Sequence, residues 1–145
     1  MFSFRLRVLL CALVLAGPAL SSCSSDDNDP APAVQPVAAQ QLTVGSWRLE
    51  EIRKNGQMTS SGSGIKDRYS LAFRTDATYT QKLLADNTTY NGTWMLMSNN
   101  TMLHLTDHKG ANTEYKLASL TTTELRYNFV NKDGQTEELF FAAQP

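Results

Sequence analysis

Short alternating segments are the feature that most constrains the fold of this chain. In residues 124–130, Leu125, Tyr127 and Phe129 alternate with polar neighbours, so the apolar side chains would share one face of an extended strand. Segments of this kind recur from residue 42 onward, and Gly, Asn or Asp residues interrupt them about every ten positions. No window keeps a helical apolar period for long. The pattern predicts an all-β fold built from short strands.

We expect eight strands joined mostly by tight turns. They cover residues 45–53, 69–74, 78–84, 89–97, 101–106, 114–119, 124–130 and 135–142. A break in the alternation before Ile52 indicates a β-bulge in the first strand. The phase of the last strand stays open, because Leu139, Phe140 and Phe141 are continuously apolar. Residues 57–67 are rich in Ser and Gly and are expected to form the one long loop.

The number of strands and the shortness of their links favour one architecture. An up-and-down antiparallel eight-stranded barrel over residues 42–145 leaves no exposed sheet edge, because the first and last strands pair. A two-sheet sandwich is the alternative. Sandwiches usually need Greek-key crossovers, and only the 57–67 loop is long enough to provide one.

Large side chains on the inward phase of these strands are the candidates for a ligand site. They are Trp47, Tyr69, Leu71, Phe73, Tyr79, Trp94, Leu96, Tyr115, Tyr127 and Phe129. An eight-stranded barrel either fills its interior with side chains or holds one small ligand. Two interpretations therefore stay open: a packed core, or a shallow cup for a small apolar or amphipathic molecule.

The segment before the strands has the character of a secretory signal followed by a linker. In residues 1–22, Arg5 and Arg7 precede an apolar run over residues 8–16 that is too short to span a bilayer. Residues 23–41 are first acidic and then rich in Pro and Ala, which predicts a disordered tether.

The junction between these two parts resembles a known processing site. Leu20-Ser21-Ser22-Cys23 is similar to the lipobox of bacterial lipoproteins, which implies cleavage before Cys23 and its diacylation. Two or more acyl chains anchor a protein stably in a membrane. The alternative is ordinary secretory cleavage beside an incidental cysteine.

The acidic residues after the cysteine carry a further resemblance. Asp26, Asp27 and Asp29 resemble the export signal of Bacteroidetes surface lipoproteins, which implies display on the outer face of the outer membrane. The alternative is a solvated charge run in an ordinary tether. We therefore expect an outer-membrane protein and leave open whether it faces the periplasm or the cell surface.

Two short motifs in the strand region resemble those of lipocalins. Gly45-Ser46-Trp47 and Gly92-Thr93-Trp94 both match the Gly-x-Trp motif, and the region looks like the short lipocalin-like domain of bacterial lipoproteins. Trp47 has the bulk to close one barrel end, and Gly45 lets a neighbouring backbone approach closely. Lipocalins commonly stack an arginine from the last strand on this tryptophan. Here Arg126 is the nearest candidate, and its phase points outward.

Charge and reactive residues exclude several function classes. Residues 42–145 carry eleven Lys and Arg against eleven Asp and Glu, so no basic excess favours nucleic-acid binding. His104 and His108 would lie about 13 Å apart along a strand, too far for a shared metal. No activated nucleophile accompanies them. We expect no metal, no cofactor and no enzymatic activity.

We expect the protein to be a monomer that is anchored in the membrane by its lipid. We expect its barrel to bind a small apolar or amphipathic ligand. The alternative is a protein-interaction or inhibitor module with a packed, ligand-free barrel, in which the 57–67 loop contacts another envelope or extracellular protein.

Overall fold

The computed structural model describes residues 37–144. The expected signal peptide, Cys23 and the tether as far as residue 36 lie outside the described residues. The elements are α1 (Val37–Leu42), β1 (Ser46–Lys54), β2 (Gln57–Ser61), η1 (Gly62–Gly64), β3 (Tyr69–Phe73), β4 (Thr78–Leu83), β5 (Thr89–Met97), β6 (Met102–Thr106), β7 (Asn112–Leu120), β8 (Glu124–Val130) and β9 (Thr136–Gln144). No helix within this range is long and apolar enough to cross a membrane.

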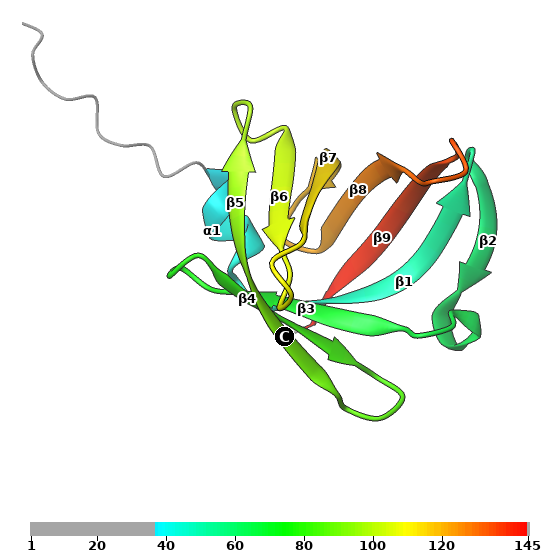
Figure 1. Ribbon diagram of the computed structural model, residues 1–145, viewed down its shortest axis with the longest axis horizontal. Coiled ribbons are helices and arrows are strands. Elements are labelled where there is room, and N and C mark those ends of the chain that lie inside the picture. The colour runs from blue at the N-terminus through cyan, green and yellow to red at the C-terminus, as the bar shows by residue number, and fades with distance from the viewer. Residues whose placement is uncertain (1–36, 145) are drawn as a thin grey trace, which may run out of the picture. The chain divides into compact units, whose positions relative to one another are not determined.

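The strands β1 and β3 to β9 form a closed antiparallel barrel (Figure 1). Consecutive strands pair from β3 to β9, and β9 returns to β1. This last pairing runs from Ser46 opposite Gln144 to Lys54 opposite Glu137. The prediction of an eight-stranded up-and-down barrel is confirmed, and the sandwich alternative is wrong.

The prediction of one long loop over residues 57–67 is wrong in its first half. Residues 57–61 form β2, which folds back from the Asn55-Gly56 turn onto the second half of β1, where Lys54 lies opposite Gln57. The first half of the same edge of β1 pairs with β3. β2 is an edge strand, and four of its five residues are exposed, so it has no apolar alternation that the sequence could reveal.

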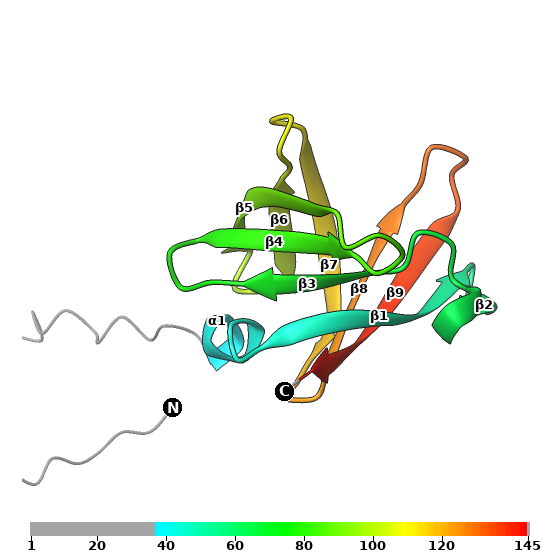
Figure 2. The same ribbon diagram turned by 90° about the horizontal axis from the view of Figure 1, so that it is seen from below.

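The tether expected up to residue 41 is also wrong at its end, because α1 begins at Val37. Ala, Gln and Leu are good helix formers and no proline interrupts residues 37–42. Ala39 packs against the core and Leu42 is fully buried. Figure 2 shows α1 leading directly into β1. The helix therefore belongs to the folded domain and covers one end of the barrel, which we call the closed end.

The structure resolves the irregularities of the first and last strands. The register between β1 and β9 shifts between Leu49 and Glu51, which places a bulge just before Ile52, as predicted. In β9, Leu139 and Phe141 are buried inside the barrel. Phe140 faces outward, where the guanidinium groups of Arg53 and Arg126 lie 4.4 and 5.1 Å from its ring centroid. Arg126 thus points outward as expected and contacts Phe140.

Candidate functional site

The barrel interior is open at the end opposite α1, where it forms a cavity of about 170 Å³ that we call the tyrosine cup. Its walls come from β3, β4, β6, β7 and β8 and from the turn between β6 and β7. The lining residues are Tyr69, Leu71, Tyr79, Gln81, Leu105, Asp107, Ala111, Thr113, Tyr115 and Tyr127.

Four tyrosines give the cup its chemical character. The hydroxyl oxygens of Tyr69 and Tyr127 lie 3.5 Å apart, and the rings of Tyr115 and Tyr127 are 4.4 Å apart between centroids. Burial raises the pKa of each of Tyr69, Tyr79, Tyr115 and Tyr127 above the usual tyrosine range. All four are therefore neutral phenols at pH 7, and each hydroxyl can donate and accept a hydrogen bond.

The remaining polar groups lie on strand β4, on strand β7 and on the turn before β7. Gln81 and Thr113 add an amide and a hydroxyl. Asp107 Oδ1 accepts hydrogen bonds from the backbone N–H groups of Lys109 (2.8 Å) and Ala111 (2.9 Å). The amides of Ala111 and Lys109 hold the pKa of Asp107 below its usual value, so a carboxylate lines the cup.

The structure divides the ten candidate lining residues into two groups. Tyr69, Leu71, Tyr79, Tyr115 and Tyr127 meet in the cup. The others belong to the packing around it: Trp47, Phe73, Trp94, Leu96 and Phe129. Half of the candidates thus pack around the cup: Trp47, Phe73 and Trp94 are buried, and Leu96 and Phe129 are partly buried against the same core.

Hydrogen bonds and close contacts fix the tryptophans of the closed end. Trp47 is 1% exposed, and its Nε1 donates to the carbonyl oxygen of Leu42 at 2.8 Å. Trp94 Nε1 donates to the carbonyl oxygen of Arg74 at 3.0 Å, and its ring packs edge-on against Phe73 with centroids 5.7 Å apart. Trp47 thus binds α1 to the barrel end, and Trp94 binds the turn between β3 and β4.

The two motif glycines sit where a side chain would collide with a neighbouring strand. A Cβ atom on Gly45 would lie 2.8 Å from the carbonyl oxygen of Gln144, so the expected close backbone approach is present. On Gly92 it would lie 2.2 Å from the carbonyl oxygen of Thr106 and 2.6 Å from the Tyr79 ring. Gly92 therefore leaves the space that holds Tyr79, a residue of the cup wall.

Five cup residues were not among the sequence candidates. They are Gln81, Leu105, Asp107, Ala111 and Thr113. Alternation identifies three of them as inward, because Gln81 follows Tyr79 by two positions, Leu105 follows the buried Leu103 by two, and Thr113 precedes Tyr115 by two. Gln81 and Thr113 do not stand out in the sequence because they are not large apolar side chains. Asp107 and Ala111 come from a turn, whose position over the barrel mouth depends on the tertiary structure.

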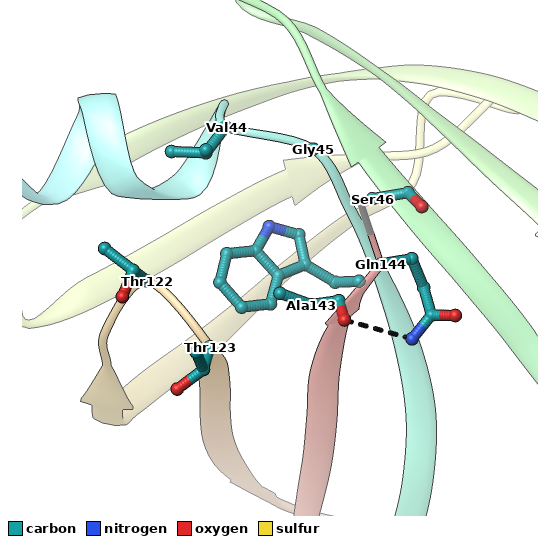
Figure 3. A pocket seen from close by; sticks show the side chains of 8 residues that line it. Val44, Gly45, Ser46, Thr122, Thr123, Ala143 and Gln144 are labelled. Carbon is teal, nitrogen blue, oxygen red and sulfur yellow. Dashed lines mark hydrogen bonds between the residues drawn. The ribbon is translucent and has the colours of Figure 1, made fainter.

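A second cavity, of about 280 Å³, lies outside the closed end (Figure 3). Thr122 and Thr123 from the turn between β7 and β8 form one side, and Val44 and Gln144 form others. Trp47, which is 1% exposed, also lines this cavity, and Gln144 Nε2 donates to the carbonyl oxygen of Ala143 at 3.1 Å. It shares no lining residue with the tyrosine cup, so it is a surface hollow separate from the interior.

The two histidines take unrelated positions. His104 faces outward on β6, with Nε2 3.3 Å from Asn112 Oδ1 and Nδ1 3.7 Å from Glu114 Oε1. His108 lies in the turn after β6 and stacks on Tyr90 at 4.7 Å between ring centroids. In the part of the chain that the structure describes, no three His, Cys, Asp or Glu side chains gather as metal ligands.

The size of the cup limits what it can hold. Drug-sized and lipid ligands usually occupy about 300–1,000 Å³. A cavity of about 150 Å³ is known to hold benzene. At about 170 Å³ the cup matches a single ring with one or two polar substituents, and it is too small for a long acyl chain.

Comparisons with known proteins point to one family and to barrel structures. A model described as the lipocalin-like domain matches residues 43–127. No curated protein matches the chain in sequence. Similar solved structures include a redesigned β-barrel, with 15% identity and a TM-score of 0.45 over 74% of this chain and 96% of the other. A de novo designed fluorescence-activating β-barrel has 18% identity and a TM-score of 0.44 over 75% of this chain and 100% of the other. A redesigned β-barrel bound to DFHBI has 18% identity and a TM-score of 0.41 over 72% and 97%.

Proposed function

Because the chain belongs to the lipocalin-like domain family, we propose that its barrel binds a small amphipathic molecule of single-ring size in the tyrosine cup. The observation that carries the proposal is the concentration of four neutral phenol groups around one open cavity. No catalytic step is part of the proposal.

The lining suggests the chemistry of the ligand. Tyrosine rings together with Leu71 and Leu105 offer apolar and aromatic contact to a flat ring. The phenol hydroxyls can donate to a carbonyl oxygen, while the Asp107 carboxylate and the Gln81 amide oxygen can accept from an N–H or O–H group. A ring that carries both a donor and an acceptor satisfies these groups, whereas a plain hydrocarbon would leave buried hydroxyls without partners.

Benzamide is a suitable probe, because it has one ring, one carbonyl oxygen and one N–H donor group. In a titration of the full-length protein followed by NMR, we expect saturable shifts of the four cup tyrosines. Palmitate should not compete, since its chain exceeds the cup. Absence of benzamide binding, or binding of palmitate in its place, would contradict the proposal.

A pair of variants separates cup binding from binding elsewhere. Ala111 is an exposed turn residue that lines the cup, so Ala111→Leu should block the cup and abolish the shifts with little effect on folding. Ala118 is equally exposed on β7 and does not line the cup, so Ala118→Leu is the matched control and should bind like the wild type. Equal binding by both variants would place the probe outside the cup.

A second candidate function is protein interaction through β2. Within residues 37–144, β2 pairs with β1 on one edge only, and Met58 on it is 62% exposed. Such an edge can accept an added strand from another protein. Met58→Lys would disfavour strand addition at this edge. Identical partners recovered from envelope extracts by the wild type and by this variant would argue against the second candidate.

We also propose that the protein is anchored in the outer membrane through lipid on Cys23. The support is the sequence Leu20-Ser21-Ser22-Cys23 and the acidic and Pro/Ala-rich stretch between Cys23 and α1. A tether of this composition would let the barrel stand clear of the membrane surface.

A further inference from the structure

A groove with a volume of about 500 Å³ lies on the outer face of β1, β3 and β4. We call it the cationic groove and define it by Arg48, Arg68, Arg74 and Lys82 around Ser70 and Thr80. It shares no lining residue with the tyrosine cup, and it lies outside the barrel.

The strand register explains why this face is hollow. Arg48 on β1 lies opposite Ser70 on β3, which lies opposite Lys82 on β4. The backbones of Arg48 and Lys82 therefore lie two strand spacings apart, about 10 Å, with a small serine between them. In the next row, Ala72 lies opposite Thr80. Small residues form the floor, and long cationic side chains form the rims.

Two of the four cations are neutralised in part, and two are not. Arg48 and Arg68 both contact Glu50, and Arg68 Nε also donates to the carbonyl oxygen of Leu49 at 2.7 Å. Across residues 37–144, no carboxylate lies within 4.0 Å of the side-chain nitrogens of Arg74 or Lys82.

Hydrogen bonds hold one free cation over the floor of the groove. Arg74 donates from one guanidinium nitrogen to Thr80 Oγ1 at 2.8 Å, and Thr80 Oγ1 donates in turn to Asn91 Oδ1 at 2.8 Å. A guanidinium fixed in this way loses less conformational entropy when it binds an anion. The equal numbers of acidic and basic residues over 42–145 do not reveal this feature, because four of the eleven basic residues line one groove.

We propose that the cationic groove binds a sugar that carries a phosphate or sulfate ester. The tetrahedral oxyanion would accept charge-assisted hydrogen bonds from Arg74 and Lys82, neither of which has a carboxylate within 4.0 Å in residues 37–144. The hydroxyls of Ser70 and Thr80 and the amide of Gln144 match the hydroxyl groups of a sugar. The volume of about 500 Å³ lies within the range of small-molecule sites and accommodates a monosaccharide ester.

The test is calorimetric titration of the full-length protein at low ionic strength with glucose 6-phosphate, glucose 6-sulfate, glucose and inorganic phosphate. We expect at least one ester to bind, glucose not to bind, and inorganic phosphate to bind at least about tenfold more weakly than that ester. The two ester arms show which oxyanion the groove prefers. Equal binding of inorganic phosphate and the esters would overturn the proposal, as would binding of glucose. Binding to anionic phosphatidylglycerol vesicles with no binding of either ester would overturn it too.

Charge-removing variants locate the site. Lys82→Gln and Arg74→Gln should each weaken ester binding by about tenfold. Lys109→Gln and Lys132→Gln remove exposed cations from turns outside the groove, and both should bind like the wild type. Lys82 is exposed, so its variant should keep the wild-type unfolding midpoint and gives a decisive result even if Arg74→Gln fails to fold. Unchanged affinity in Lys82→Gln, or equal losses in the control variants, would refute the assignment. Ala111→Leu should leave ester binding intact, because it blocks only the cup.

Discussion

The indole Nε1 of Trp47 donates a hydrogen bond of 2.8 Å to the carbonyl oxygen of Leu42, the last residue of α1. Both side chains are buried, at 1% and 0% exposure. One bond thus satisfies a carbonyl at the end of the helix and holds the helix over the closed end of the barrel. The tryptophan of the Gly-x-Trp motif therefore fixes the helix in place as well as filling the barrel end.

This contact predicts the effect of Trp47→Phe. The phenyl ring cannot donate, so the buried Leu42 carbonyl would lose its partner at a cost of about 1–3 kcal/mol in the free energy of unfolding, with a further loss from the smaller ring. Urea denaturation measures this change. Trp94→Phe is the control. The carbonyl oxygen of Arg74, which accepts the hydrogen bond from Trp94, lies at a more exposed turn and can accept a hydrogen bond from water instead. A larger loss in Trp94→Phe than in Trp47→Phe would contradict the role given to the Leu42 bond.

Gly92→Ala should be strongly destabilising. The added methyl group would lie 2.2 Å from the Thr106 carbonyl oxygen and 2.6 Å from the Tyr79 ring, so β5, β6 or the ring must move. Overpacking of this kind costs about 1–3 kcal/mol or more. The matched control is Gly64→Ala, where no atom lies within 4 Å of the added methyl group, and its effect should stay within about 0.5 kcal/mol. Equal unfolding midpoints for the two variants would show that β5 and β6 tolerate the methyl group.

The cup tyrosines predict loss of stability in alkali. Burial raises the pKa of all four in the folded state above the unfolded value of 10.0. Above about pH 10 the unfolded chain releases protons that the native state still holds, so the free energy of unfolding falls as pH rises. This stabilisation is fully present below pH 10. Urea denaturation at about pH 8 and about pH 11 should show the decrease.

Tyr127→Phe supplies the control for this pH dependence. Tyr127 is 1% exposed. The variant removes one of the four tyrosine hydroxyls whose pKa is raised, and it keeps the ring that packs against Tyr115. Its stability should therefore fall less steeply between the two pH values than that of the wild type. An identical slope would show that ionisation of the buried phenols does not cause the alkaline loss.

Cys23→Ala tests the proposed membrane anchor. Without the thiol no diacyl group can be attached, so the protein should move from the detergent phase to the aqueous phase in a detergent partition experiment. The barrel should keep its circular dichroism spectrum, because Cys23 precedes α1 by more than a dozen positions. Ser24→Ala is the control and should partition like the wild type. A Cys23→Ala protein that stays in the detergent phase would exclude the lipid anchor.

The strand pattern is the part of the fold that was predictable from sequence. In β8, Leu125 and Tyr127 alternate with outward residues because one face of the strand is buried, and this asymmetry leaves a period of two in the sequence. Closure of the barrel followed from the same argument, since eight such strands with short links leave two edges that must pair. The bulge before Ile52 was visible as a break in that period.

The two elements that the sequence did not predict, β2 and α1, show no alternation between a buried and an exposed face in their sequence. β2 is exposed on most of its residues, so no apolar face marks it, and α1 is too short for a helical period to be visible. Ile65, at 5% exposure, enters the core from the link after η1, where the sequence indicated only a loop. The positions of β2, α1 and Ile65 depend on contacts with residues that are distant in sequence.

The sequence by itself thus determined the all-β barrel and, outside the last strand, which large side chains face inward, because those features follow from local alternation. Only the tertiary structure decided that five of the ten candidates form a cup while the others pack around it. It also brought Asp107 and Ala111 over the barrel mouth and aligned Arg48, Ser70 and Lys82 across three strands. The physical reason is that cavities and charged surfaces arise from the register between strands, and register is a relation between distant parts of the chain.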